Sequence, residues 1–187
     1  LSASQPLADL AASAANALGH AAEGPLTPLS SPLPKLAALE AARLIAAALA
    51  DPERPDRDAL ALGALLAGYV IGSTGYGLHH VVSQTLVRFA GLGHGQANAI
   101  MLPHTIAALS RRSPDWFALL GDALGEDPAA FASRLGALAG ARGLGEAGVQ
   151  ESALEGVAEQ AASRRELKMT PPAADRAALV ELLRAAL

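Results

Sequence analysis

Apolar residues recur at helical spacing through almost the whole chain, and this pattern limits the possible folds more than any other feature. Segments rich in Ala and Leu repeat their apolar residues every three or four positions, whereas no stretch of convincing length alternates as a half-buried strand does. Apolar residues make up 51% of the chain but aromatic residues only 3%. A core of Ala, Leu, Val and Ile suits closely packed helices. We therefore predict an all-α fold in a single multi-helix domain, residues 1–187.

Proline and glycine divide this pattern into about eight or nine predicted helices. Apolar spacing places them at 6–23, 35–50, 57–72, 77–89, 94–109, 113–124, 127–140, 151–162 and 175–187. Residues 26–34 contain three prolines and are expected to form an irregular loop. The third helix is apolar on nearly every side, so we expect it to be central and buried. Pro103 is expected to kink or divide the fifth helix.

Several short motifs receive a structural interpretation. Ser113 precedes Pro-Asp, which predicts a helix start with the serine as N-cap. The glycines of segment 72–77 do not match a phosphate-binding pattern and indicate close helix packing with a bend. Trp116 is expected in the core or an interface. Arg164 and Arg165 are expected at a solvated helix end.

Charge and composition exclude several classes of protein. The net charge is −4 without a basic block, which argues against a nucleic-acid surface. No run approaches 18 strictly apolar residues, so no membrane-spanning helix is expected, and residues 1–4 carry no basic segment of a signal peptide. The absence of cysteine excludes disulfides and thiolate metal sites but leaves imidazole and carboxylate ligands. It is compatible with a cytoplasmic location, and the richness in Ala and Gly suggests a bacterial source.

Histidine is concentrated in one stretch of the sequence. Four of the five histidines lie within residues 77–104, and the fifth, His20, follows Asn16 by four residues on an expected helix. Residues four apart lie on one helix face with Cβ atoms ~5–6 Å apart. His80 and Gln84 repeat this spacing. His94 stands at a helix start, where a side chain can project into a cleft.

These residues suggest a metal site. Two imidazoles from His80 and His94, together with the imidazole of His20 and the amide of Asn16, form a suitable ligand set for Fe²⁺ or Zn²⁺. The alternative is that the histidines only make local hydrogen bonds. Adjacent side chains on a helix point ~100° apart, so His79 and His80 cannot both face one site.

Two further assignments weigh a structural role against a functional one. Asn16 could equally bond to its helical neighbours. His104, after Pro103, is more readily explained by a structural role.

Three segments resemble the iron-containing (group III) alcohol dehydrogenase family. They are Asn-Ala-Leu-Gly-His-Ala-Ala-Glu at 16–23, Gly-Leu-His-His at 77–80 and Gly-His-Gly-Gln-Ala-Asn-Ala-Ile-Met-Leu-Pro-His at 93–104. Within the family, the maleylacetate reductase branch is most similar, since it carries Asn-Ala-x-x-His and Gly-Leu-His-His. The resemblance covers essentially the whole chain.

The resemblance implies a protein with two domains that bind different groups. An N-terminal α/β domain binds NAD(P), and a C-terminal helical domain carries the metal. This chain corresponds to the C-terminal domain, with the nucleotide-binding domain absent from it. The metal positions would be Asn16 (usually Asp in the alcohol dehydrogenases), His20, His80 and His94.

The same resemblance bears on proton transfer. Gln84 stands where many relatives have a histidine four residues after the ligand. A glutamine cannot relay a proton near neutral pH, so the catalytic positions His79 and Gln84 imply a path through His79, water or substrate.

The leading hypothesis is therefore one half of an NAD(P)-dependent oxidoreductase that reduces a small carbonyl compound, with maleylacetate as the first candidate. The chain alone is expected to be inactive, and a homodimer is expected. The alternative is a non-catalytic helical interaction module with incidental histidines. A metallohydrolase with Glu23 as general base ranks lower, because the sequence lacks H-E-x-x-H.

Overall fold

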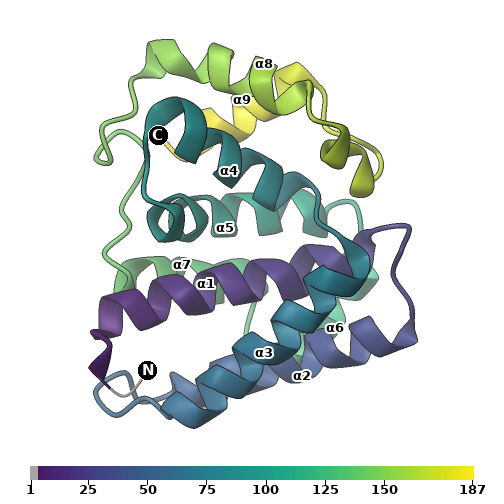
Figure 1. The fold of residues 1–187 in the computed structure, drawn as a ribbon, viewed down its shortest axis with the longest axis vertical. Coiled ribbons are helices and arrows are strands. Elements are labelled where there is room, and N and C mark those ends of the chain that lie inside the picture. Colours follow the sequence, from purple (N-terminus) through teal and green to yellow (C-terminus); the bar gives the residue numbers. More distant parts are fainter. Residues whose placement is uncertain (1–3) are drawn as a thin grey trace.

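The computed structural model describes residues 4–187, and every regular element in that range is helical (Figure 1). The α-helices are α1 (Leu7–Glu23), α2 (Pro32–Ala48), α3 (Arg57–Thr74), α4 (Leu78–Ala90), α5 (His94–Ser110), α6 (Pro114–Leu124), α7 (Pro128–Leu138), α8 (Leu154–Ala162) and α9 (Arg176–Ala185). Short 3₁₀ turns lie at Gly24–Leu26, Glu151–Ala153 and Arg165–Met169. The all-α prediction is confirmed.

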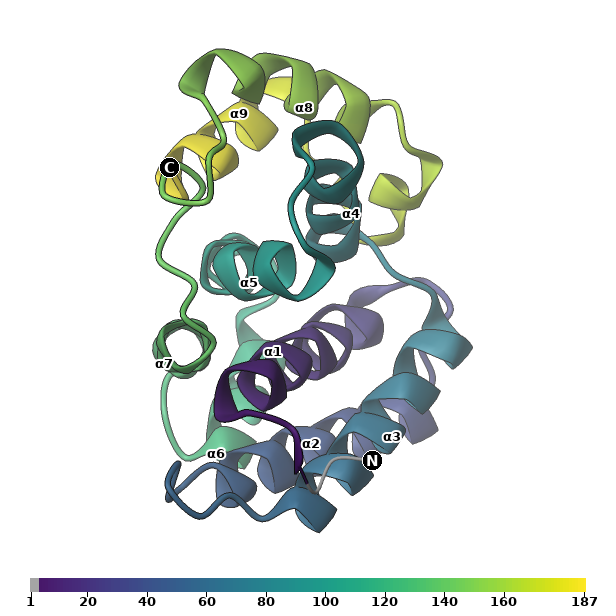
Figure 2. The ribbon, with the colours of Figure 1, turned by 60° about the vertical axis from the view of Figure 1, so that its left-hand side comes forward.

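Helix α1 lies at the centre of the molecule. It packs against α2 and α3 on one side and against α5 and α7 on the other. Helix α4 crosses α5, and α8 and α9 cover this pair at the end of the molecule opposite α2 and α3 (Figures 1 and 2). The C-terminal half of α1 therefore meets the start of α4.

Close packing around α1 follows from its sequence. Its inner surface is built almost entirely of alanine with Leu10 and Leu18; the buried alanines are Ala11, Ala14, Ala15, Ala17, Ala21 and Ala22. Small side chains let neighbouring helices approach closely without leaving voids. Trp116, buried as predicted, donates from its indole nitrogen to the carbonyl of Ala22 at 3.1 Å and ties α6 to α1.

Aspartate side chains cap the starts of three helices. The side chains of Asp56, Asp127 and Asp175 accept from backbone N–H groups at the starts of α3, α7 and α9. Helix α6 begins at Pro114, as expected. Ser113 stands at the N-cap position of α6, as predicted, but its side chain makes no capping bond.

The structure corrects the loop predicted at 26–34. Helix α2 begins within it, at Pro32. Proline is tolerated in the first turn of a helix because the first N–H groups have no intrahelical partner. Two prolines, Pro32 and Pro34, therefore start the helix instead of preventing it.

The structure also corrects the burial predicted for the third helix. In α3, Leu62, Leu65 and Tyr69 are 48–69% exposed, whereas residues such as Ala67 and Val70 are fully buried. A helix that is apolar on every side can be buried on every side. In α3, however, neighbours within residues 4–187 bury only one face.

Pro103 does not divide the fifth helix, because α5 is continuous from His94 to Ser110. A proline in a helix removes the bond to the carbonyl four residues earlier, here that of Ala99. Gly136 of α7 packs against this carbonyl so closely that a Cβ atom there would lie 3.2 Å from its oxygen. Helix α7 therefore packs directly on the carbonyl that Pro103 leaves without a helical hydrogen bond.

The bend predicted at 72–77 is confirmed, since α3 and α4 meet at 98°. Within the described residues, no single helix is both long and apolar enough to cross a membrane, although this bent pair together meets the criteria of length and composition.

Candidate metal centre

Side chains from distant segments satisfy the first backbone N–H groups of α4. Leu78 N donates to Thr170 Oγ1 at 3.0 Å, and His79 N donates to Glu23 Oε2 at 2.8 Å. His80 N lies 3.4 Å from Glu23 Oε1. These N–H groups carry the positive end of the helix dipole, so a carboxylate is stabilised there. Glu23 has no exposed surface, and this position explains how its carboxylate is accommodated.

Glu23 also orients the ring of His80. Its Oε1 lies 2.6 Å from His80 Nδ1. A carboxylate accepts only, so Nδ1 carries the hydrogen. The second ring nitrogen, Nε2, then points away from Glu23 towards Asn16 Oδ1, at 3.4 Å. A carboxylate behind a histidine is the usual support of a metal-binding imidazole, because it fixes the tautomer and strengthens the donor nitrogen.

Asn16 links His80 to His20. Asn16 Nδ2 lies 3.4 Å from His20 Nε2, which confirms that the two residues share a face of α1. The rings of His20 and His80 lie 4.6 Å apart between centroids. The structure therefore brings together three of the four predicted ligands.

His94 lies apart from these three. It lines a cavity of about 430 Å³ together with Asn16 and His20, but its own contact is with Asn98, whose Nδ2 lies 3.3 Å from His94 Nε2. Within residues 4–187, no group of three or more His, Asp or Glu side chains forms a ready-made metal cluster. His94 thus shares the cavity without joining the contacts of the other three.

One contact of Asn16 has the separation that two ligands of a single ion would show. His80 Nε2 and Asn16 Oδ1 lie 3.4 Å apart. Two ligands at ~2.1 Å from one tetrahedral ion are separated by roughly this distance. These two donor atoms therefore fit a divalent ion.

Burial keeps the neighbouring imidazoles neutral. Burial, reinforced by the nearby His80, lowers the pKa of His20 to about 3. Burial likewise places the pKa of His79 well below its ordinary value. His20 is therefore neutral across the neutral range of pH, and the neutral imidazole is the form that binds a metal.

His79 is enclosed by its neighbours. Its Nδ1 lies 2.9 Å from Thr105 Oγ1, and its ring meets that of His80 edge-on with centroids 4.8 Å apart. The ring fills the space above Gly19, where a Cβ atom would lie 2.5 Å from it. Its Nε2 has no hydrogen-bond partner among the described residues. Both rings lie against Gly19 of α1, since a Cβ atom there would also lie 3.4 Å from His80, so the two side chains do not diverge as far as predicted.

Gln84 has a partner that the sequence did not reveal. Arg164 donates from Nη1 to Gln84 Oε1 and from Nη2 to the hydroxyl of Tyr76, each at 3.0 Å. The side chain of Arg164 is only 15% exposed, so its predicted place at a solvated helix end is wrong. The ring of Tyr76 in turn lies 6.0 Å from that of His80.

A hydrolytic role for Glu23 conflicts with these contacts. Both of its oxygens are engaged with α4, and the side chain is fully buried. A general base must reach the proton of an attacking water. Glu23 is therefore a support for His80 and α4.

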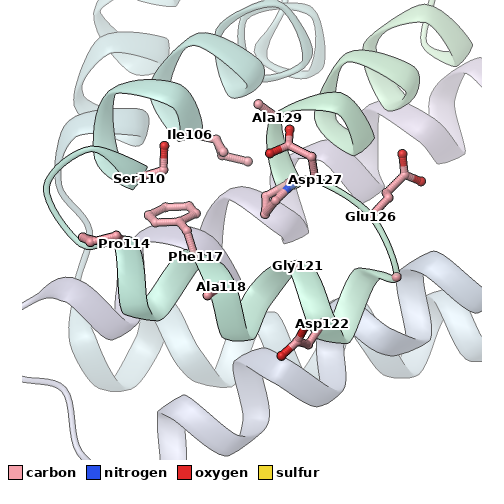
Figure 3. A pocket seen from close by; sticks show the side chains of 12 residues that line it. Ile106, Ser110, Pro114, Phe117, Ala118, Gly121, Asp122, Glu126, Asp127 and Ala129 are labelled. Atoms are coloured by element: carbon pink, nitrogen blue, oxygen red, sulfur yellow. The ribbon is translucent and has the colours of Figure 1, made fainter.

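A larger cavity of about 730 Å³ lies between α5, α6 and α7 (Figure 3). Three acidic residues line it, namely Asp122, Glu126 and Asp127. Glu126 forms an ion pair with Arg134, and Asp127 caps α7 by accepting from Ala130 N at 2.8 Å. Glu126 and Asp127 therefore serve the local structure.

Comparison with known proteins agrees with this architecture. Residues 10–187 match the C-terminal part of the Fe-containing alcohol dehydrogenase family. The maleylacetate reductase of Pseudomonas aeruginosa is 34% identical over 186 residues, which cover 96% of this chain and 52% of that protein. The 1,3-propanediol dehydrogenase of Klebsiella pneumoniae is 31% identical over 128 residues, which cover 66% of this chain and 33% of that protein.

A solved structure shows the same fold. The crystal structure of maleylacetate reductase from Agrobacterium tumefaciens superimposes with a TM-score of 0.88 at 31% identity, covering 98% of this chain and 54% of that one. The chain thus spans about half the length of these two maleylacetate reductases. It belongs to the iron-containing alcohol dehydrogenase family, as a helical C-terminal domain similar to that of the maleylacetate reductases.

Proposed function

We propose that this chain is the metal- and substrate-binding half of an NAD(P)-dependent reductase of small carbonyl compounds, with maleylacetate as the first candidate substrate. The single observation that carries the proposal is the Asn16–His20–His80 group, in which Glu23 turns His80 Nε2 towards Asn16. Relatives named maleylacetate reductase match over nearly the whole chain and support the choice of substrate.

The proposed site binds Fe²⁺ or Zn²⁺ through Asn16, His20, His80 and His94. When bound, the ion would polarise the substrate carbonyl as hydride arrives from the nicotinamide. His94 is included because it lines the same cavity as Asn16 and His20. Asn16 supplies a neutral oxygen, which holds a divalent ion less strongly than a carboxylate does.

The chain's own residues have separate proposed roles around the reacting centre. Glu23 holds the His80 ring through a bond of 2.6 Å. His79 fixes the packing of α4 on α1 and lies edge-on to His80, where it would take part in proton movement. Gln84 accepts from Arg164, so its proposed role is to position that cation.

The nicotinamide would be held by a separate nucleotide-binding domain; the two maleylacetate reductases compared above are about twice as long as this chain. The proposal includes a homodimer and a cytoplasmic location. For the 187 residues alone, we expect no oxidation of NADH in the presence of a carbonyl substrate. Measurable turnover would contradict this part of the proposal.

Metal binding tests the proposal directly. Anaerobic titration of the chain with Fe²⁺ or Zn²⁺, followed by calorimetry and by elemental analysis after desalting, should give one ion per chain. His80→Ala and His94→Ala should each abolish retention, whereas His104→Ala should not. If the parent chain retains no ion, or if His80→Ala retains it equally well, the proposal fails and a non-catalytic helical module becomes the better explanation.

A further inference from the structure

Arg164 is a nearly buried cation whose partners are mostly neutral. Its terminal nitrogens bond to an amide oxygen and a phenol, those of Gln84 and Tyr76. Its ion pair with Glu166 joins Nε to a carboxylate oxygen at 3.5 Å. A guanidinium kept out of water is costly unless an anion compensates it closely. The long contact to Glu166 leaves room for a closer anion.

These two bonds leave the guanidinium with unused donors. Each terminal nitrogen carries two hydrogens, and each gives one to a partner at 3.0 Å. One N–H therefore remains on each terminal nitrogen. Two such groups in a planar fork match the two oxygens of a carboxylate.

The fork is held next to the candidate metal centre. Gln84 lies one helical turn after His80 on α4. The ring of Tyr76 lies 6.0 Å from the ring of His80 and 5.9 Å from the guanidinium carbon of Arg164. Tyr76 therefore connects the two groups, and both of the residues that hold Arg164 also adjoin His80.

We propose that Arg164, held by Gln84 and Tyr76, binds a carboxylate group of the substrate while its carbonyl lies at the metal centre. This inference rests on the proposed function and narrows it to substrates that carry a carboxylate. It also gives Gln84 a reason to be an amide. Its oxygen accepts from the guanidinium, whereas a protonated imidazole in its place would repel the cation.

Binding of a simple dicarboxylate tests the inference on the full 187-residue chain. We would titrate ¹⁵N-labelled protein with glutarate and follow the Nε–H of Arg164 and the side-chain amide of Gln84 by NMR. Saturable shifts are expected, and dimethyl glutarate, which has no charge, should produce none. In Arg164→Met, glutarate should bind at least about tenfold more weakly. Arg43→Met, which removes an exposed arginine on α2, is the matched control and should retain full affinity.

Two variants keep the test decisive if Arg164→Met fails to fold. Tyr76→Phe and Gln84→Met each remove one bond to the guanidinium and should each weaken glutarate binding several-fold. Unchanged affinity in both of them, or in a folded Arg164→Met, would overturn the inference. So would equal shifts with the diester, or no saturation with glutarate.

A parallel Zn²⁺ titration separates this inference from the proposed function. Zn²⁺ should shift the ring signals of His20 and His80, and Arg164→Met should leave its affinity unchanged. If Zn²⁺ does not bind while glutarate binds through Arg164, the proposed metal centre fails and the carboxylate site stands. Zn²⁺ binding without glutarate binding gives the reverse result.

Discussion

Carboxylates lie in two contrasting parts of this molecule and make different contacts in each. Glu23 is completely buried and divides its oxygens between the start of α4 and the ring of His80. Glu126 and Asp127 lie at the larger cavity of Figure 3, where one pairs with an exposed arginine and the other caps a helix. The histidine group that Glu23 supports is the better functional candidate. The partners of a charge and its burial are therefore more informative than cavity volume or the number of acids.

The largest effect should come from removing the charge of Glu23. Glu23→Gln keeps the size of the side chain but leaves α4 and His80 without their anion. We expect the free energy of unfolding in urea to fall by about 3 kcal/mol, and Zn²⁺ affinity to fall roughly 10- to 100-fold. Glu126→Gln is the matched control and should change stability by less than about 0.5 kcal/mol. Equal losses of unfolding free energy in the two variants would show that the buried and the exposed carboxylate do not differ.

A second contrast uses two helical glycines. Gly19→Ala should lower the free energy of unfolding by about 2–3 kcal/mol, because its Cβ would lie 2.5 Å from the buried His79 ring. Gly121 borders the larger cavity, and a Cβ there meets its nearest neighbour at an ordinary 3.4 Å. Gly121→Ala should therefore stabilise the chain by up to roughly 1 kcal/mol through helix propensity. Urea denaturation of both variants measures the difference, and a stabilising Gly19→Ala would contradict the packing described here.

Acid should weaken the buried centre in a defined range of pH. Unfolding returns His20 to its ordinary pKa of 6.5, whereas the folded chain keeps that pKa at about 3. Between these values the unfolded chain binds a proton that the folded chain does not, so stability falls as the pH falls. The loss from His20 should reach roughly 2 kcal/mol at pH 5. Thermal melts from pH 7 to pH 4 should show it, with a shallower slope in His20→Leu; an identical slope would show that other groups are responsible.

The smallest effect concerns the cap at the larger cavity. Asp127→Ala should cost about 1 kcal/mol, because one N–H at the start of α7 loses its acceptor. Asp127→Asn should restore most of this loss, since an amide oxygen also caps. Calorimetry measures both, and unchanged Zn²⁺ affinity in both would confirm that this cap is independent of the metal centre.

Local spacing predicted much of this structure. The four-residue interval between Asn16 and His20 placed both on one face, and Asp127 before proline marked a helix start. Helix boundaries mostly fell within a few residues of those predicted. Residue order alone determines such features, because their partners lie within one or two turns.

Contacts between distant segments were not predictable in the same way. Glu23 meets His80 across 57 residues, and Arg164 meets Gln84 across 80. Neither pair leaves a periodic trace in the sequence. Burial of α3 was misjudged for a related reason, since an apolar helix does not reveal which of its faces a neighbour covers.

The start of α4 limits how far the chain could be shortened while keeping the candidate metal centre intact. Its opening N–H groups depend on Glu23, 56 residues upstream of His79, and on Thr170, 92 residues downstream of Leu78. A peptide made only of α1 and α4 would lack one of these acceptors. A minimal version of the centre must therefore extend at least to Thr170, and shortening the chain from its C-terminus would disturb the histidines before it removed any of them.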